Sequence, residues 1–140
     1  MARADRQTVI QKKRVLYSDF LTNFDQNPHT GYLGVVTNEQ AIKQSYKNLI
    51  LTNKGERYGD SEKGSNIRAK LFDLHDTIAT EALVLEIKST LNAYEPRGEI
   101  INVEFIDSLD ANALDIRLVF RAINDQDQIY SLDLHVQRVR

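Results

Sequence analysis

The chain has 140 residues, enough for one domain with its own core, and its formal charge is nearly balanced at −2. Apolar residues make up 41% and charged residues 27%, which is ordinary for a folded domain and excludes a disordered tail. Cysteine is absent, so disulfides, thiolate zinc sites and cysteine nucleophiles are excluded. No apolar run approaches the ~18 residues of a membrane span, and residues 1–15 lack the apolar core of a signal peptide, so we expect a cytosolic product.

Charge is distributed unevenly along the chain. Residues 1–14 carry five basic side chains against one acid, a net +4, whereas residues 99–133 carry eight acids against two arginines, a net −6. The acidic second half would repel phosphate, so we expect no nucleic-acid partner. This asymmetry predicts an extended N-terminal arm over residues 1–14 and a single domain over residues 15–140.

The first half of the chain predicts short extended pieces followed by a helix. Residues 14–20 have strand-like composition, residues 23–30 are typical of a loop, and residues 31–36 form a short extended piece. Thr37 and Gln40 fit a capping box that would open a helix. An apolar stripe follows at helical spacing: Ile42, Tyr46, Leu49 and Ile50. We expect this helix to end near residues 52–55, where a polar loop containing three glycines runs through residues 53–65.

Two more helices are predicted before the spacing of apolar residues changes from that of a helix to that of a strand. Residues 66–72 favour a short helix, and the longest helix is expected from Asp76 or Thr77 to about Tyr94. Pro96 ends it, because a proline disfavours helical geometry in the residue before it. The predicted buried stripe of the long helix consists of Ile78, Ala82, Leu85, Ile87, Leu91 and Tyr94.

From Glu99 onward, apolar residues alternate with polar ones in three runs separated by Asp- and Asn-rich joins. The alternating positions are Ile101, Val103 and Phe105; then Leu114, Ile116, Leu118, Phe120 and Ala122; then Tyr130, Leu132, Leu134 and Val136. Such runs predict an antiparallel meander with one buried face. The fold class is therefore α+β, an antiparallel meander packed against two or three helices.

The sequence offers little for catalysis. The three histidines, His29, His75 and His135, have no metal-ligand spacing, and no nucleophile, phosphate-loop or metalloprotease motif occurs. We therefore expect no metal, cofactor or small-molecule ligand. The twenty carboxylates could contain a glycosidase pair, which needs one acid in an apolar pocket. A solvated acidic surface is the favoured interpretation.

Two segments differ from generic surface. One is Gly55, Glu56 and Arg57 in the polar loop, and the other is Glu95, Pro96 and Arg97 at the end of the long helix. The simpler interpretation of the second is a helix stop followed by an exposed ion pair, worth ~0–1 kcal/mol. The alternative is a stiff corner whose acid and planar guanidinium dock on a partner at little entropic cost.

These motifs, taken in order, resemble one family. The chain resembles the phage baseplate assembly protein W family in four motifs that follow one another in order. They are I-x6-L-I-L-T-x-x-G-E-R from Ile42 to Arg57, Gly64-Ser65, Leu-Phe-Asp at 71–73, and Glu-Pro-Arg-Gly at 95–98. Members of this family are baseplate wedge and sheath-initiator proteins of contractile tails, with a type VI secretion counterpart. The resemblance covers about residues 37–140. Glu62-Lys63 departs from it, because relatives often carry a proline there.

The resemblance implies a function. It implies a sheet similar to the inter-subunit domain of the tail sheath protein, and Glu95, Pro96 and Arg97 as residues that hold the wedge together. It implies a non-enzymatic virion protein of the tail baseplate, made in the host cytoplasm, with other wedge proteins and the tail sheath protein as partners. We expect it to template the first sheath ring through edge strands. The alternatives are a peptidoglycan-degrading, lysozyme-like tail hydrolase and a type VI secretion baseplate subunit, although no matched motif supports catalysis.

Overall fold

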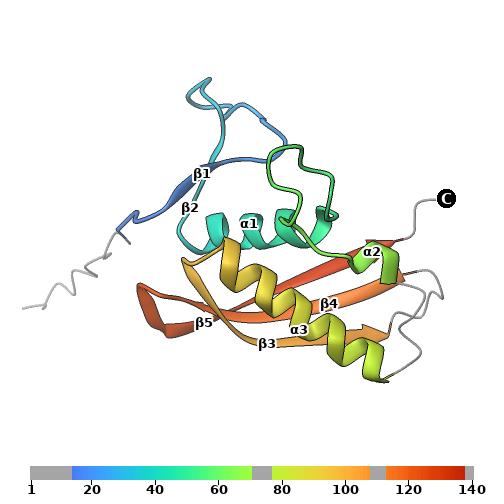
Figure 1. Cartoon of the computed structure of the whole chain (residues 1–140). Coiled ribbons are helices and arrows are strands. Elements are labelled where there is room, and N and C mark those ends of the chain that lie inside the picture. The colour runs from blue at the N-terminus through green and yellow to red at the C-terminus, as the bar shows by residue number, and fades with distance from the viewer. Residues whose placement is uncertain (1–13, 71–76, 108–112, 138–140) are drawn as a thin grey trace, which may run out of the picture. The chain divides into compact units, whose positions relative to one another are not determined.

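A computed structural model describes residues 14–70, 77–107 and 113–137 (Figure 1). The chain divides into two compact units, and the boundary in the sequence lies between Asn38 and Glu39. The predicted arm, apart from Arg14, and the Leu-Phe-Asp motif lie outside the described residues. Within the described part of the chain, no helix is long and apolar enough to cross a membrane.

The first unit contains a two-stranded hairpin. Strands β1 (Ser18–Phe20) and β2 (Val35–Thr37) are antiparallel, with Asp19 opposite Val36. Asn38 follows with a positive φ of 49°, and its side chain accepts a hydrogen bond from the Leu16 amide (2.8 Å) and donates one to the Arg14 carbonyl (3.0 Å). The predicted helix start at Thr37 is therefore wrong. Thr37 belongs to β2, and the left-handed backbone of Asn38 separates the strand from the helix.

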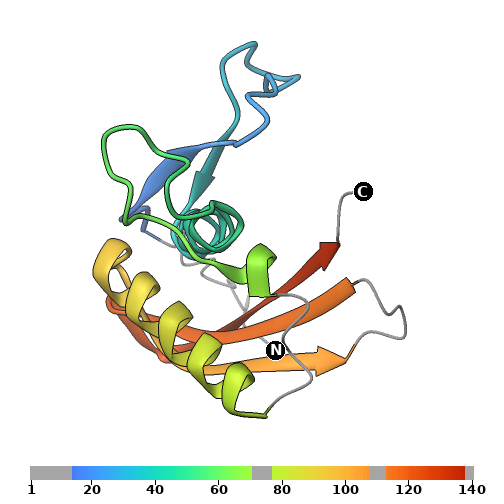
Figure 2. The same cartoon turned by 45° about the vertical axis from the view of Figure 1, so that its right-hand side comes forward.

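The second unit is an antiparallel sheet covered on one face by helices. It contains α1 (Glu39–Leu51), α2 (Ile67–Lys70), α3 (Thr77–Tyr94), β3 (Gly98–Asp107), β4 (Ala113–Ala122) and β5 (Asp125–Gln137). The strand order β3-β4-β5 confirms the predicted meander and the α+β class. The helices α1 and α3 lie on the same face of the sheet, with α1 against β5 and α3 against β3 (Figures 1 and 2).

The core lies between this sheet face and the two long helices. The α1 stripe is buried as predicted, and so are all five inward positions of β4. On β5, Leu134 and Val136 are buried while Tyr130 and Leu132 are partly covered, on the predicted face. Tyr46 packs edge-on against Phe120, with ring centroids 5.1 Å apart. The largest fully buried side chains are Tyr46, Phe120, Ile42, Ile50, Ile67, Leu83, Ile87, Leu91, Ile116 and Leu118.

The predicted stripe of α3 is partly wrong. Ile78 and Leu85 are 75% and 68% exposed, whereas Leu83, Ile87 and Leu91 are fully buried. Apolar residues occur on more than one side of this helix, so helical spacing is compatible with a buried stripe that contains Leu85 and also with one that contains Leu83. Packing against the sheet and α1 selects the one that contains Leu83.

Strand β3 departs from strict alternation. Its pairing with β4 shifts between Ile100 and Asn102, so Ile101 is the extra residue of a β-bulge and is 44% exposed. The predicted burial of Ile101 is therefore wrong, and Ile100, opposite Phe120, occupies that place in the ladder. Strand β5 begins at Asp125, five residues before Tyr130, the first of its predicted alternating positions, and follows a tight turn at Ile123 and Asn124.

Candidate partner-binding site

Glu95 and Arg97 form a fork-shaped ion pair at the corner between α3 and β3. The Arg97 Nε donates to Glu95 Oε1 and its Nη2 to Oε2, each at 2.6 Å, and the Arg97 amide donates to Oε1 at 3.3 Å. The Glu95 side chain is 3% exposed and that of Arg97 29% exposed. The simpler of the two interpretations, an exposed ion pair, is therefore wrong, because the carboxylate is buried and hydrogen-bonded within the chain.

The surroundings of Glu95 keep it charged. Burial by itself would raise the pKa of Glu95, but hydrogen bonds from Arg97 and from the Ser45 hydroxyl on α1 outweigh burial and hold the pKa below its usual value. The Arg97 carbonyl also accepts a hydrogen bond of 3.0 Å from the Ile123 amide in the β4–β5 turn. This corner therefore joins α3, β3, α1 and the turn, and we call residues 95–97 the corner.

Tyr46 and Gly98 complete the corner. The Tyr46 hydroxyl is buried and has no hydrogen-bond partner among the described residues. Burial, and after it the Glu95 charge, raise the pKa of this phenol, so it stays protonated. A Cβ on residue 98 would collide with the Tyr46 hydroxyl and lie 3.1 Å from Ile42 Cγ2. The glycine after Glu-Pro-Arg is thus required by the close approach of α1 to the first residue of β3.

The predicted polar loop of residues 53–65 lies within the longer connection between α1 and α2, residues 52–66, which begins with hydrogen bonds between Asn53 and Glu56. The Glu56 carboxylate accepts hydrogen bonds from the Asn53 amide and the Asn53 side chain, both at 2.8 Å. These hydrogen bonds lower the pKa of Glu56, the one from the Asn53 backbone amide more than the one from the Asn53 side chain. Gly55 takes a positive φ of 88°, and its amide donates to the Ser61 carbonyl at 2.8 Å. Gly55 and Glu56 therefore shape the loop.

The end of the loop is fastened to the core. The Ser65 amide donates to the Thr52 carbonyl (2.9 Å), and its buried hydroxyl donates to the Ile50 carbonyl (2.6 Å) at the end of α1. Thr90 on α3 donates to the Gly64 carbonyl at 3.3 Å. Gly64 has a φ of 133°, and an added Cβ would lie 2.5 Å from the Thr52 carbonyl oxygen. Thus the Gly-Ser motif is a structural lock between α1, the loop and α3.

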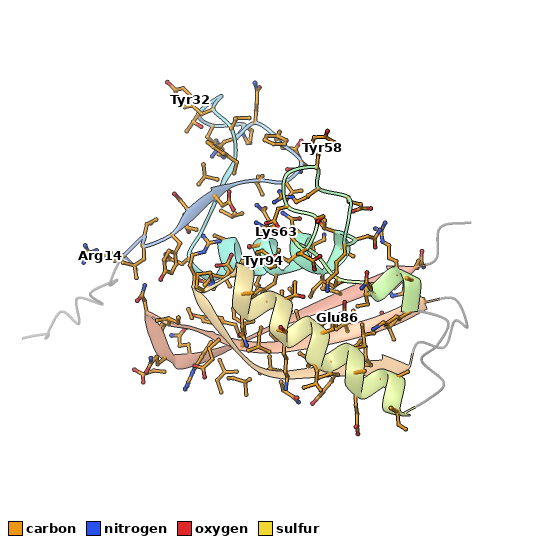
Figure 3. All side chains as sticks on the ribbon, in the orientation of Figure 1. Arg14, Tyr32, Tyr58, Lys63, Glu86 and Tyr94 are labelled. Carbon is orange, nitrogen blue, oxygen red and sulfur yellow. The ribbon has the colours of Figure 1, made fainter. Side chains whose placement is uncertain are left out.

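Charged side chains also hold the loop against α3 (Figure 3). Glu86 on α3 pairs with Lys54 of the loop at 3.3 Å and with Lys70 of α2 at 2.9 Å. Burial opposes ionisation of Glu86, but the two lysines outweigh it and lower the pKa. Lys63 lies 5.4 Å from the centroid of the Tyr94 ring, so the loop reaches the residue directly before the corner. These contacts make one braced region from residues 52–66 and the corner.

The uncovered face of the sheet carries cross-strand ion pairs. Arg117 on β4 pairs with Asp133 on β5 at 2.7 Å, and Arg121 pairs with Glu99 on β3 at 2.8 Å. Arg117 lowers the pKa of Asp133. The His135 ring nitrogen Nδ1 lies within hydrogen-bonding distance of the Asp115 carboxylate, which occupies the opposite position in the ladder. No group of His, Asp and Glu suited to hold a metal ion occurs among the residues that the structure describes.

The sequence is similar to that of a known baseplate protein. No family model matches the sequence. The chain is 29% identical over 97 residues to baseplate wedge protein gp25 of Enterobacteria phage T4, a match that spans 69% of this chain and 74% of that protein. This relationship confirms the resemblance to baseplate wedge proteins that the motifs predicted.

Solved structures share the fold. A protein from Geobacter sulfurreducens that bears the name tail lysozyme superposes with a TM-score of 0.63 at 23% identity, covering 73% of this chain and 92% of that one. A chain in the baseplate of the anti-feeding prophage superposes with a TM-score of 0.60 at 16% identity, covering 86% of this chain and 85% of that one. The chain therefore shares its α+β fold with these proteins, and it is similar in sequence to the baseplate wedge protein of phage T4.

Sequence reasoning found both motif segments but not the role of each residue. The structure shows Glu95, Gly55 and Glu56 as braces, leaves Pro96 and Arg57 exposed, and half-buries Arg97. It also reveals Tyr58, which is fully exposed at the outer end of the loop. A tyrosine within the polar stretch NKGERYGD was the signal that could have indicated it.

Proposed function

We propose that this protein is a structural subunit of a contractile-tail baseplate wedge that links the wedge core to the tail sheath and templates the first sheath ring. The sequence relationship to a baseplate wedge protein carries this proposal. The fold, which is shared with a chain of a baseplate assembly, supports it. The proposed location is the baseplate of the virion tail, and the proposed partners are other wedge proteins and the sheath protein.

The proposed template is the outer edge of β5. Within the described residues, β4 pairs with β3 and β5, so each outer strand has one side without a neighbour in the sheet. The pairing of β3 with β4 shifts at Ile101 and is unbroken only from Asn102 to Asp107, whereas the pairing of β5 with β4 shifts between Asp125 and Ile129 and is then unbroken from Ile129 to Gln137. A regular edge offers evenly spaced N–H and C=O groups to an incoming strand, and a bulge discourages such pairing. The regularity of β5 favours it as the acceptor of an extended sheath arm.

The proposed contacts with the wedge core lie at the corner and on the loop. Glu95 is buried, so its role is to fix the orientation of Arg97, while exposed Pro96 and the accessible part of Arg97 provide the surface. In the same way Gly55 and Glu56 fix the position of Arg57. Both segments would enter an interface with little further loss of conformational entropy.

We infer that the protein is not an enzyme, although a structural neighbour bears the name tail lysozyme. A glycosidase needs a carboxylic acid whose pKa is raised, so that it can donate a proton near neutral pH. The buried carboxyl group of Glu95 and the partly buried one of Glu86 have lowered pKa values because basic side chains pair with them. A turbidity assay on purified cell walls should show no clearing at any pH between 4 and 8.

Nucleation of sheath polymerisation in vitro tests the templating function. Val136→Pro and Gln137→Pro remove amides that point to opposite sides of β5, because successive N–H groups alternate along a strand. We expect one variant to lose the inner ladder and misfold, and the other to fold and fail to shorten the polymerisation lag. If both fold and both nucleate as well as the unmodified protein, the β5 edge is not the template.

A further inference from the structure

The outer end of the loop 52–66 carries two exposed side chains of the types that dominate protein interfaces. Tyr58 is 108% exposed and Arg57 is also exposed (Figure 3). Among the described residues, neither the Arg57 guanidinium nor the Tyr58 ring contacts another side chain through a hydrogen bond, an ion pair or a ring contact. Tyrosine and arginine are enriched among residues that contribute most to binding. A fully hydrated tyrosine ring gains the most when a partner covers it.

The backbone around these two residues is held in place. The Asp60 amide donates to the Arg57 carbonyl at 3.3 Å, which closes a turn around Tyr58. The bond from the Gly55 amide to the Ser61 carbonyl closes a wider turn outside it. The pair is thus presented on a preorganised turn, which reduces the entropy lost on docking.

The acids nearest to Arg57 in sequence are engaged elsewhere. Glu56 accepts two hydrogen bonds from Asn53, and Asp60 forms a side-chain hydrogen bond with Tyr94. These two acids are thus occupied within the chain, which leaves the exposed Arg57 guanidinium able to pair with an acid of another protein. A planar guanidinium binds a carboxylate through two parallel hydrogen bonds, which fixes both distance and orientation.

We propose that Arg57 and Tyr58 form an anchor that docks on a neighbouring tail protein, with the Tyr58 ring in an apolar pocket and Arg57 on a carboxylate at the rim of that pocket. This inference rests on the proposed function, since it assumes that the chain is assembled into a tail, and it adds Tyr58 to the proposed binding residues. It also divides the loop by role: Gly55 and Glu56 hold the turn, and Arg57 and Tyr58 make the contact.

Site-specific photocrosslinking in assembled tails tests the anchor. The photoreactive residue p-benzoylphenylalanine replaces Tyr58 in one sample and exposed Lys47 on α1 in the control, and purified tails are irradiated. We expect a covalent adduct from position 58 with one other tail protein, at a peptide that lines an apolar pocket with an Asp or Glu at its rim. The presence of the chain in purified tails is checked first by immunoblot. If the chain is absent from tails, the proposed function fails; if it is present without an adduct at position 58, only the anchor fails.

Substitutions provide the second measurement. Tyr58→Ala and Arg57→Ala should each lower incorporation into tails at limiting expression by about tenfold or more, the effect of losing a dominant interface residue. Arg57→Glu should be at least as severe, because it places two carboxylates together. Arg68→Ala, which removes an exposed arginine from α2, is the matched control and should incorporate normally. All variants should keep the melting temperature of the unmodified protein. Normal incorporation of both Tyr58→Ala and Arg57→Ala would overturn the proposal.

Discussion

The corner predicts that Arg97→Ala destabilises the fold at neutral pH. Removing one partner of a buried ion pair costs about 3–5 kcal/mol, because the other charge stays buried without compensation. Since the Arg97 side chain is 29% exposed and the Ser45 hydroxyl still faces Glu95, we expect a smaller loss of about 2–3 kcal/mol in the free energy of unfolding. For a chain of this size that corresponds to a melting temperature lower by roughly 6–12 °C.

The loss should depend on pH in a defined direction. In the unmodified protein the folded-state pKa of Glu95 lies below its usual 4.5, so the ion pair stabilises fully above pH 4.5 and its contribution falls as the pH drops through the folded pKa. In the variant, the Glu95 carboxyl is buried without the guanidinium, so its pKa rises. At neutral pH the buried, unpaired charge destabilises the fold, and this destabilisation disappears at low pH, where the carboxyl is protonated. The difference between the two proteins should therefore be largest near pH 7 and shrink toward pH 4.

Urea unfolding followed by circular dichroism measures this difference at both pH values. Arg117→Ala is the matched control, because Arg117 also pairs with an acid but both side chains are exposed, and its midpoint should hardly move. Adding Glu95→Gln to Arg97→Ala should restore part of the stability at pH 7, since it removes the uncompensated charge. Equal losses at pH 7 and pH 4, or a loss no larger than that of Arg117→Ala, would refute the argument.

Three further predictions, made with two pairs of substitutions and one single substitution, concern the packing of the core and of the loop. Leu83→Ala should cost about 2–5 kcal/mol of unfolding free energy because Leu83 is fully buried, whereas Leu85→Ala, at an exposed position of the same helix, should stay within about 0.5 kcal/mol. Gly64→Ala should cost about 1–3 kcal/mol because its φ is positive and a Cβ would meet the Thr52 carbonyl, while Gly59→Ala, which meets nothing within 4 Å, should be neutral. Tyr46→Phe should leave the melting temperature unchanged or raise it, because it deletes a buried hydroxyl without a partner. Thermal melting checks all three, and the reverse order within either pair, or a marked loss with Tyr46→Phe, would contradict the packing described.

The sequence by itself determined the elements whose signal is local. Strict alternation from Leu114 to Ala122 required a half-buried strand, and the structure buries all five of the predicted positions. Helical spacing from Ile42 to Ile50 defined the buried stripe of α1, and Pro96 placed the end of α3 at Tyr94. These predictions succeeded because neighbours a few residues apart decide each of them.

Tertiary structure alone decided the features that depend on distant partners. The buried face of α3, the bulge at Ile101 and the burial of Glu95 arise from contacts with residues far away in the chain. The corner shows why the sequence could not decide these features. Glu95 and Arg97 are two residues apart at the end of a helix, which favours an exposed ion pair, and this spacing contains no information about α1 lying across them. Only when Ser45 and Tyr46 pack against the corner does the carboxylate leave water, and Arg97 then becomes its required counter-ion.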